Sequence, residues 1–411
     1  MITKRKSLLF LQIVVLLLLV GGMAPAGANS VPRRVHAENK VPGNVESSAR
    51  RLANGMTQQG YDVARGYFTL YTQDDCPFSY DVLRSCLGNN PAAPYVLPVV
   101  PAWPDEWVDP GTVGIVGPTF EGYNASYRLD PSEAIVIVGQ LPPSAAYLGL
   151  QTYLLSRPGE WATDSPQYTF VKDHVPALLQ TFFTKLPKNA DRVQLFADLG
   201  SPVNNVVIER RSGEVWNQLR AVVITPDGSM DAAVRAALLK LGIADTEVFT
   251  EKIPSSLGGI DMALGLGEAS DDFLTVMRYA MPFDGGGIGT PSATWRKDLP
   301  LVVMRIRDAR ATHEPQPYPT VEFEARTGTV PPETSLAPDL VSLAKAVCGR
   351  WGQPCDLEGL AFEQRAPRLL NMRTALSMTG PECVKVGMNC LAPTDDTAYF
   401  MSARLPLPDD R

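Results

Sequence analysis

Short apolar runs that end at proline, glycine or aspartate recur along this chain from residue 112 onward. Turn residues at this spacing favour strands over long helices, because each of them ends a regular element after a few residues. With 36 prolines, 33 glycines and only 20% charged residues, the composition is typical of a loop-rich, mostly β protein. Strands are predicted within residues 124–156 and at 193–199, 204–210, 271–282, 299–309, 320–328 and 397–405.

One strand–helix–strand unit interrupts the β pattern. QLRAVVITP (218–226) has the β-branched residues of a strand, and DGSMDAAVRAALLKLGI (227–243) has apolar residues at helical spacing, with a start near Ser229. DTEVFTEKI (245–253) follows as a second strand, and a unit of about 35 residues has the length of a crossover connection. Other helices are predicted at 46–60, with Asn54 and Gly55 as an early stop signal, and at 169–186 and 336–351.

These elements predict an α+β fold that is predominantly β, with sandwich-like antiparallel sheets, inserted helices and one strand–helix–strand unit. The roughly 380 residues that follow a leader are enough for two domains. We expect a flexible lead-in and a short helix over residues 29–60, a β-rich N-terminal domain over 61–200 and an α+β C-terminal domain over 201–411.

The segment 89–110 holds six prolines in 22 positions. Proline has no N–H to donate and blocks a helix interior, so this segment is predicted to be extended and irregular, outside any central strand. Tyr95, Trp103 and Trp107 are available to pin it onto the body of the protein. An exposed aromatic stretch of this kind can also stack on sugar rings, and this alternative stays open beside simple burial of the aromatic side chains.

The N-terminus has the pattern of an export signal. Three basic residues at 4–6 precede an apolar run at 8–20, and the small residues Ala26, Gly27 and Ala28 then match a cleavage site. A membrane-spanning helix needs about 20 apolar residues, so the pattern predicts a signal peptide over 1–28, with an uncleaved anchor as the alternative. Either reading places the rest of the chain outside the cytoplasm, as a secreted or extracytoplasmic protein.

Removal of residues 1–28 takes three positive charges from a chain of 37 basic and 44 acidic residues, leaving a net charge of about −10. Nucleic acids and anionic membrane surfaces bind clustered positive charge, so the sequence argues against both as partners. No membrane span is expected in the mature chain, because charge or proline breaks every later apolar run.

Six cysteines fall into three local pairs. An even count in an exported chain indicates a disulfide framework. Zinc knuckles and redox motifs need CxxC-type spacing, which this chain lacks, so no metal is expected there. Each local pair brackets a segment rich in turn residues, which favours the pairing of Cys76 with Cys86, Cys348 with Cys355, and Cys383 with Cys390.

No complete catalytic signature is present in the sequence. The chain has three histidines, His36, His174 and His313, and it lacks the HExxH, GxSxG and GxxxxGK[ST] motifs. A serine paired with His174 or His313 stays open, because the members of a catalytic triad can be distant in sequence. A pair of carboxylates, as in glycosidases, also stays open. No cofactor is expected.

Two glycine-rich segments, 256–272 and 283–292, are predicted to form long mobile loops. Such loops often border binding sites, so we expect a ligand cleft, if one exists, to lie between them. The residues predicted to line it or lie near it are Asp261, Glu268, Asp271, Asp272, Asp284, Trp295 and Arg296.

Four strings carry a resemblance to a known group: YRLDPSEAIVIVGQLPPSAAYLGLQTYLL, FADLGSPVNNVVI, TPDGSMDAAVRAALLKLGI and GMNCLAPTDDTAY. Together they resemble uncharacterised exported bacterial proteins of the domain-of-unknown-function kind. In that group a turn carries an aromatic residue into the next strand; Gly139, Pro142 and Tyr147 match it here, with an offset at Pro143. The resemblance spans about residues 60–400. It implies secretion and a β-rich fold, and it assigns no catalytic residue.

These observations favour an exported, disulfide-stapled protein that binds a ligand or a component of the cell envelope. The motivation is the leader, the paired cysteines and the lack of a complete catalytic motif. A secreted hydrolase, built on carboxylates or on a serine and a histidine, is the alternative from a different class.

Overall fold

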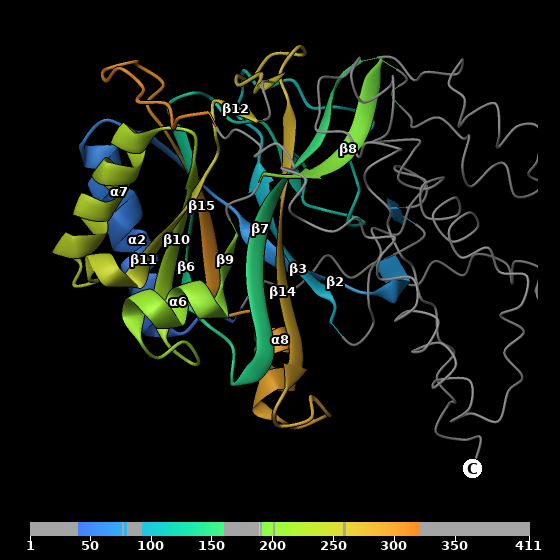
Figure 1. Ribbon diagram of the computed structural model, residues 1–411, viewed down its shortest axis with the longest axis vertical. Helices are drawn as coiled ribbons and strands as arrows, with labels where there is room; N and C mark the ends of the chain where they lie inside the picture. Colours follow the sequence, from blue (N-terminus) through green and yellow to red (C-terminus); the bar gives the residue numbers. More distant parts are fainter. Residues whose placement is uncertain are drawn as a thin grey trace, which may run out of the picture. The chain divides into compact units, whose positions relative to one another are not determined.

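The computed structural model describes residues 40–75, 78–79, 93–159, 189, 191–199, 202–257 and 260–320. Within this part of the chain, two β-sheets face each other and helices cover the outer face of the first sheet (Figure 1). The predicted fold class, α+β and predominantly β with a sandwich, is confirmed.

The first sheet has the strand order β1-β15-β6-β10-β11. Its neighbours are antiparallel except β10 and β11, which run parallel and are joined by helix α7. This confirms the predicted strand–helix–strand unit, since a parallel pair needs a crossover connection. The strands are β1 (Asp62–Arg65), β6 (Glu133–Gln140), β10 (Leu219–Thr225), β11 (Val248–Lys252) and β15 (Leu301–Arg307).

The second sheet has the order β2-β3-β14-β7-β8 and is antiparallel throughout this path. Its strands are β2 (Tyr67–Tyr71), β3 (Tyr95–Pro101), β7 (Ala145–Pro158), β8 (Arg192–Asp198) and β14 (Asp272–Pro282). Three short strands extend it, namely β4 (Tyr123–Asn124), β5 (Ser126–Tyr127) and β9 (Val203–Asn204). A separate hairpin joins β12 (Ser256–Leu257) to β13 (Ile260–Asp261).

Helices α2 (Gly43–Gln58) and α7 (Gly228–Lys240) pack side by side on the first sheet (Figure 1). Two shorter helices, α6 (Asn205–Ser212) and α8 (Pro291–Asp298), follow β9 and β14. Single 3-10 turns occupy Gln73–Asp75 (η1) and Asp245–Glu247 (η2). No helix of the described residues is long and apolar enough to cross a membrane.

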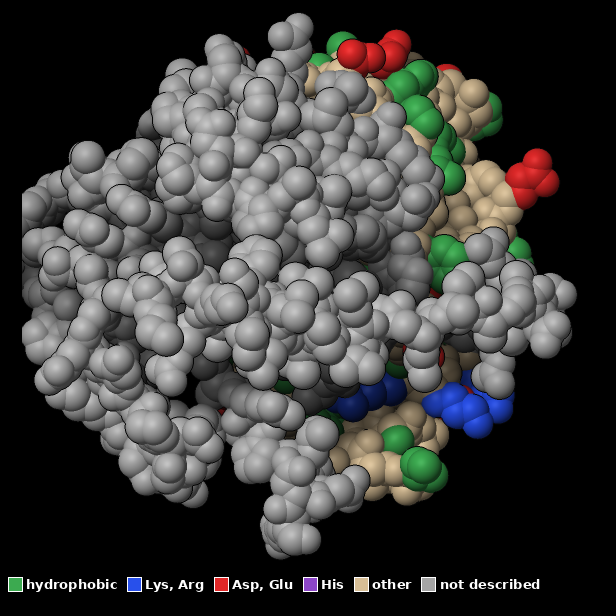
Figure 2. All heavy atoms as spheres, turned by 90° about the vertical axis from the view of Figure 1, so that its right-hand side faces the viewer, with side chains coloured by type: hydrophobic (Ala, Val, Ile, Leu, Met, Phe, Trp, Pro, Cys, Tyr) green, Lys and Arg blue, Asp and Glu red, His purple; other side chains and the backbone are tan. Residues whose placement is uncertain are grey.

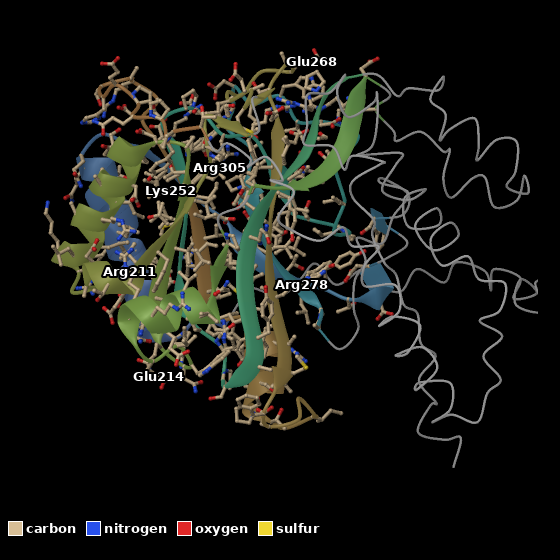
Figure 3. The ribbon with its side chains drawn as sticks, in the orientation of Figure 1. Arg211, Glu214, Lys252, Glu268, Arg278 and Arg305 are labelled. Carbon is tan, nitrogen blue, oxygen red and sulfur yellow. The ribbon has the colours of Figure 1, made fainter. Side chains whose placement is uncertain are left out.

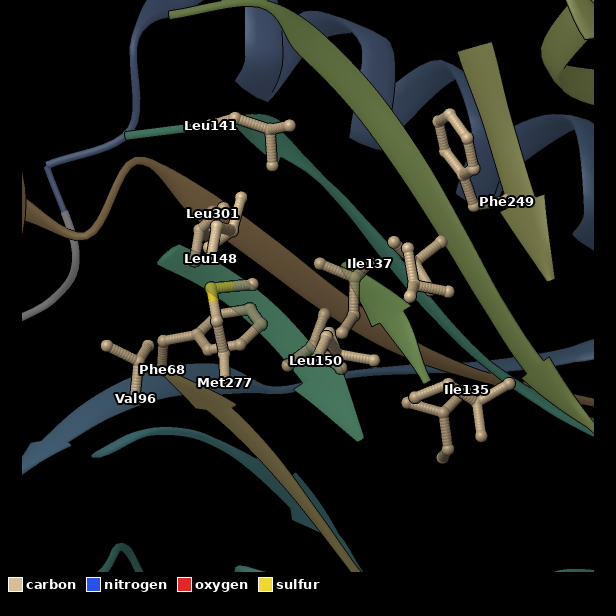
Figure 4. Close-up of a cluster of buried hydrophobic side chains, with 14 of the residues drawn as sticks. Phe68, Val96, Ile135, Ile137, Leu141, Leu148, Leu150, Phe249, Met277 and Leu301 are labelled. Carbon is tan, nitrogen blue, oxygen red and sulfur yellow. The ribbon is translucent and has the colours of Figure 1, made fainter. Parts of the chain in front are cut away.

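Successive apolar side chains along the strands of the first sheet point to opposite faces, so the sheet separates two hydrophobic cores. On β6, Ile135 and Ile137 point between the sheets, while Val136 and Val138 point toward α2 and α7. Figure 4 shows the core between the sheets, where Ile135 and Ile137 meet Leu150 of the second sheet. A third core covers the far face of the second sheet, and it includes Tyr71, Leu97, Ile115, Leu155 and Val276.

The chain passes from one sheet to the other at Gly66, between β1 and β2. The N–H of Gly66 donates to the carbonyl of Val303, which lies 2.9 Å away. A Cβ at this position would lie 2.3 Å from the carbonyl oxygen of Val99. Only glycine fits, because the backbones of the two layers approach each other here.

Both sheets take strands from either side of the predicted domain boundary at residue 200. The first sheet combines β1 and β6 with β10, β11 and β15, and the second combines β2, β3, β7 and β8 with β14. The described residues of 61–200 and of 201–320 therefore share the core between the sheets.

Two local predictions are wrong. NNVVIER was predicted as a strand, but Asn205–Ser212 is helix α6, because the side chain of Asn204 accepts a hydrogen bond from Val207 N and caps a helix. The proline-rich segment was predicted to avoid central strands, but it contains β3, which lies between β2 and β14. Strand β3 pairs with β14 only at Tyr95 and Val96. Pro98 lies beyond this pairing, so its missing N–H leaves no gap in the hydrogen bonds between β3 and β14.

One helix end differs from prediction. Helix α2 continues through Asn54 and Gly55 to Gln58, because four buried apolar side chains hold that face on the sheet: Val45, Ala49, Leu52 and Met56. Helix α7 begins at Gly228, next to the predicted start near Ser229, and the side chain of Asp227 caps it.

Several predictions fall outside the described residues. They are the signal peptide, all six cysteines, His36, His174, the helices at 169–186 and 336–351, and nearly all of the strands at 320–328 and 397–405.

Candidate functional site

An open groove of about 600 Å³ lies where three segments meet, namely the end of α2 with β1, the loop that follows β3, and the end of β15. We call it the Trp103 groove. Its volume lies within the range typical of small-molecule sites. It is lined by Thr57, Tyr61, Asp62, Val63, Trp103, Pro104, Asp105 and Arg307.

Arg307 is the buried cation of the groove. Its guanidinium lies 4.5 Å from the ring centre of Trp103, and it donates to both carboxylate oxygens of Asp105 at 2.9 and 3.0 Å. Asp62 lies farther away, at 3.8 Å from Nη2. Both aspartate side chains are more than half exposed, so both carboxylates also face solvent beside the guanidinium. One positive and two negative charges give this side of the groove a net negative charge.

Trp103 is held from behind by a buried ion cluster. Its indole Nε1 donates to Glu133 at 3.0 Å, and Glu133 pairs with Arg305, which is fully buried between the sheets (Figure 3). Arg305 also pairs with Glu106 and donates to the carbonyls of Pro101 and Arg128. Burial opposes the charge of Arg305, but the two carboxylates outweigh it and raise its pKa. The tryptophan is therefore fixed in place.

Next to the groove, Tyr61 stacks on His313 with ring centres 5.8 Å apart. His313 is exposed, and its Nδ1 lies 3.0 Å from Oδ2 of the buried Asp308. The same oxygen accepts hydrogen bonds from the backbone N of His313 and from Thr312 Oγ1. Burial alone would raise the pKa of Asp308, but these hydrogen bonds outweigh it and lower the pKa to about 2. Burial raises the pKa of Tyr61, and Asp308 and Asp227 add to the shift.

A second polar cluster lies deeper, at the end of β14 and β7. Arg192 pairs with Asp109 and Asp272 at 3.4 and 3.2 Å, and Arg128 pairs with Asp272 at 3.4 Å while stacking on Trp107. Burial raises the pKa of Asp272 to about 6, against the two arginines. The adjoining cavity measures about 10 Å³, which is room for one water molecule, so this cluster is a structural one.

Four of the predicted cleft residues lie at this end of the sandwich. Asp271 is buried and pairs with Arg157 at 3.1 Å, and Asp272 follows it at the start of β14. The carbonyl of Asp261, on β13, accepts a hydrogen bond from the same arginine, while the residue itself is exposed. Glu268, labelled near the top of Figure 3, lies at this end too, and its carbonyl accepts a hydrogen bond from Arg192. The carboxylates of Asp271 and Asp272 thus face arginines of the protein.

The other three predicted residues lie at the opposite end of β14, beside α8 (Figure 1). Asp284 accepts hydrogen bonds from the backbone N and the hydroxyl of Ser292. Trp295 is buried with its Nε1 on the carbonyl of Gln140, and Arg296 donates to the carbonyl of Tyr279. Eleven strand residues, about 35 Å, separate the two sets, so they do not share one cleft.

The groove residues other than Trp103 were not singled out from the sequence. A signal was present in MRIRD at 304–308, where charged residues alternate with apolar ones on a buried strand. Such alternation places Arg305 and Arg307 on one face, and a buried arginine needs carboxylate partners. Their partners Asp62, Asp105 and Glu133 lie far away in sequence, so the groove itself could not be deduced.

Among the residues that the structure describes, no group of three or more His, Cys, Asp or Glu side chains is arranged to hold a metal ion. Comparisons with protein-family models, with curated proteins and with solved structures find no match for this chain.

Proposed function

We propose that this protein is an exported binding protein that holds a small, positively charged ligand in the Trp103 groove. The observation that carries the proposal is the pair of exposed carboxylates, Asp62 and Asp105, on either side of a buried guanidinium in a groove of about 600 Å³. The leader and the paired cysteines support export, as expectations from the sequence.

The groove offers two kinds of contact. The carboxylates of Asp62 and Asp105 each keep an exposed side for an ammonium or amidinium group, because Arg307 satisfies them from the inner side only. Tyr61, Val63 and Pro104 supply apolar surface next to them. A ligand with a cationic head and a small apolar or aromatic body matches both. The wall is rigid, because Trp103 is fixed by Glu133, so little ordering is needed on binding.

A hydrolase remains the second candidate, and Asp308 with His313 favours it. A buried carboxylate that accepts from Nδ1 orients the imidazole in the way that catalytic dyads require. The hydrogen bonds of His313 within the described residues use its backbone N and its Nδ1, so no described serine or threonine occupies Nε2 as a nucleophile would. Binding therefore stands first.

The test uses benzylamine and benzamidine as probes, with benzyl alcohol as the neutral counterpart, and calorimetry as the measurement. We expect the cations to bind and the alcohol not to bind. The double variant Asp62→Asn with Asp105→Asn should weaken binding at least about tenfold, because two charge-assisted contacts are lost. Glu209→Gln, an exposed change on α6, is the matched control and should leave binding unchanged.

Two results would overturn the proposal. One is equal affinity of the cationic probes for the wild-type protein and the double variant, or no binding at all. The other is hydrolysis of an ester substrate panel that disappears in a folded His313→Ala variant, which would instead establish the second candidate.

A further inference from the structure

The last residues of β14 and the loop that leads from it to α8 expose three large apolar side chains. Met281, Phe283 and Ile288 have 66%, 73% and 107% of their surfaces exposed, so the described body of the protein covers little of them. We call these three residues the apolar tip. The loop lies at the lower end of β14 in Figure 1, and Figure 2 shows hydrophobic side chains exposed at the lower end of the described part. Exposed apolar surface of this kind marks an interaction site.

Hydrogen bonds give the loop a defined conformation. Asp284 accepts from Gly286 N at 3.0 Å and from the hydroxyl of Ser292 at 2.5 Å, and Phe283 N donates to the carbonyl of Ser144 at 2.9 Å. Met281 has a φ of 54°, which a residue with a side chain rarely adopts. The fold thus accepts local strain at Met281, near the end of β14, where the chain enters the loop that presents apolar side chains to solvent.

The N-terminal segment leaves the described structure at the same end of the protein. Lys40 N donates to the carbonyl of Asp298, the last residue of α8, at 3.0 Å. The chain that precedes Lys40 leads back to the apolar run at 8–20. During export, and permanently if the segment is uncleaved, this run holds the chain at a membrane. Lys40, the first described residue, therefore lies at the end of the described body that carries the tip.

The side chains around the tip suit a bilayer interface. Lys40 and Lys297 are exposed beside α8, and their long stems can reach headgroup phosphates while the tip lies deeper. Tyr147, exposed on β7, pairs with Ala280 next to the tip and has the amphipathic ring typical of interfaces. Asp284 is exposed in the same loop, and its carboxylate accepts hydrogen bonds from the backbone N and the hydroxyl of Ser292 on α8.

We propose that the apolar tip inserts into the interfacial region of a phospholipid bilayer and docks the exported protein on the membrane. A protein partner of ordinary size would need about 800 Å² on each side, which three side chains on one loop do not offer. Insertion into a bilayer needs no such area. Each apolar side chain that enters the boundary between headgroups and acyl chains adds its own share to the free energy of binding. The protein is acidic overall, so apolar contact and not net charge drives the docking.

Docking by the tip leaves the Trp103 groove open to the aqueous side. Strand β15 begins at Leu301, three residues after α8, and ends at Arg307 in the groove. Seven strand residues, about 20 Å, thus separate the tip end from the groove end. The inference goes beyond ligand binding in the groove and does not depend on it.

The experiment measures insertion at the tip in the full-length chain with phosphatidylcholine vesicles whose acyl chains carry bromine, a quencher of tryptophan fluorescence. The variant Phe283→Trp is compared with Leu239→Trp, which places tryptophan at an exposed apolar position of α7. For each variant, the quenching of tryptophan fluorescence is compared with that of the unsubstituted protein, which has six tryptophans of its own. Far-UV circular dichroism checks that each variant keeps the fold.

We expect strong quenching of the tryptophan introduced at the tip, persisting in high salt, and none of the one on α7. Adding Ile288→Asp to Phe283→Trp should abolish the quenching, because it replaces the most exposed apolar side chain of the tip by a second charge in this loop. Equal quenching at both positions, no quenching at the tip, or loss of quenching in salt would overturn the inference. The comparison is informative even if residues 1–28 bind the vesicles, because it measures which surface enters the bilayer.

Discussion

Buried arginine, aspartate and glutamate side chains form ion clusters in the interior of this protein. Arg128 and Arg305 are among its largest fully buried side chains, and each faces carboxylates and backbone carbonyls. A buried charge without such partners would be costly, so each of these residues is tied to the others of its cluster. The same rule explains why Asp271 and Asp272 face arginines at one end of β14.

At this scale, Asp308 should make stability depend on pH. Its carboxyl has a pKa of about 2 in the folded protein, below the value of 3.8 for a free side chain. The folded state therefore favours the ionised form, and this contribution is complete above pH 3.8 and is lost as the pH falls through 2. We expect Asp308→Asn to lower the melting temperature at neutral pH and the difference from wild type to shrink toward pH 2.

Melting curves from pH 7 to pH 2, followed by circular dichroism, give the measurement. Glu314→Gln, an exposed change in the same loop, is the control and should follow the wild-type curve. A constant difference between Asp308→Asn and wild type across this range would contradict the prediction.

At the scale of elements, a capping side chain determines whether the segment 204–210 forms a helix or a strand, which its apolar pattern does not reveal. NNVVIER has three consecutive β-branched residues, which favour a strand. Helix α6 forms there because Asn204 caps it, Ile208 is buried, and Gly213 with a φ of 76° ends it. Val206 and Val207 remain exposed, as expected for a short helix that buries one face only.

The cap of α6 can be tested directly. Asn204→Ala removes the acceptor for Val207 N and should lower the free energy of unfolding by about 1 kcal/mol. Asn204→Asp keeps an acceptor at the same place and should stay close to wild type. Urea denaturation of the three proteins measures the difference, and equal stability of Asn204→Ala and wild type would refute the role of the cap.

At the scale of the whole molecule, a chain of polar groups links the two sheets. Glu251 of β11, in the first sheet, accepts hydrogen bonds from the backbone N and the hydroxyl of Thr152 on β7. The hydroxyl of Thr152 also lies 2.8 Å from that of Thr275, which in turn lies 2.6 Å from Tyr127. The link crosses an otherwise apolar interface, so it fixes how the sheets align.

Loss of this link should destabilise the sandwich. Thr152→Val keeps the volume but deprives the carboxylate of Glu251 of one donor, so we expect a loss of about 1.5–3 kcal/mol in the free energy of unfolding. Thr69→Val is the matched control. The hydroxyl of Thr69 is buried without a hydrogen-bond partner among the described residues, so its removal should be neutral or stabilising. Chemical denaturation measures both, and equal losses in the two variants would contradict the assignment.

Most of the described strands could be predicted from the sequence. The runs at 271–282 and 299–309 are β14 and β15, and the unit at 218–253 is β10, α7 and β11. Alternation of apolar residues and turn residues is local, so it is visible without the fold. The candidate site could not be predicted to the same extent, because Asp62, Trp103 and Arg307 come from three distant segments.

The α+β class, the places of most strands and the charge balance could be read from the sequence, since they follow from residues near one another in the chain. The three-dimensional structure was needed to show which strands share a sheet, that Arg307 faces Asp105, and that Asp271 and Asp284 lie at opposite ends of β14. It was also needed to show that the tip of 281–288 stays uncovered by the described body. These facts depend on how the layers pack, and packing joins residues that no short stretch of sequence brings together.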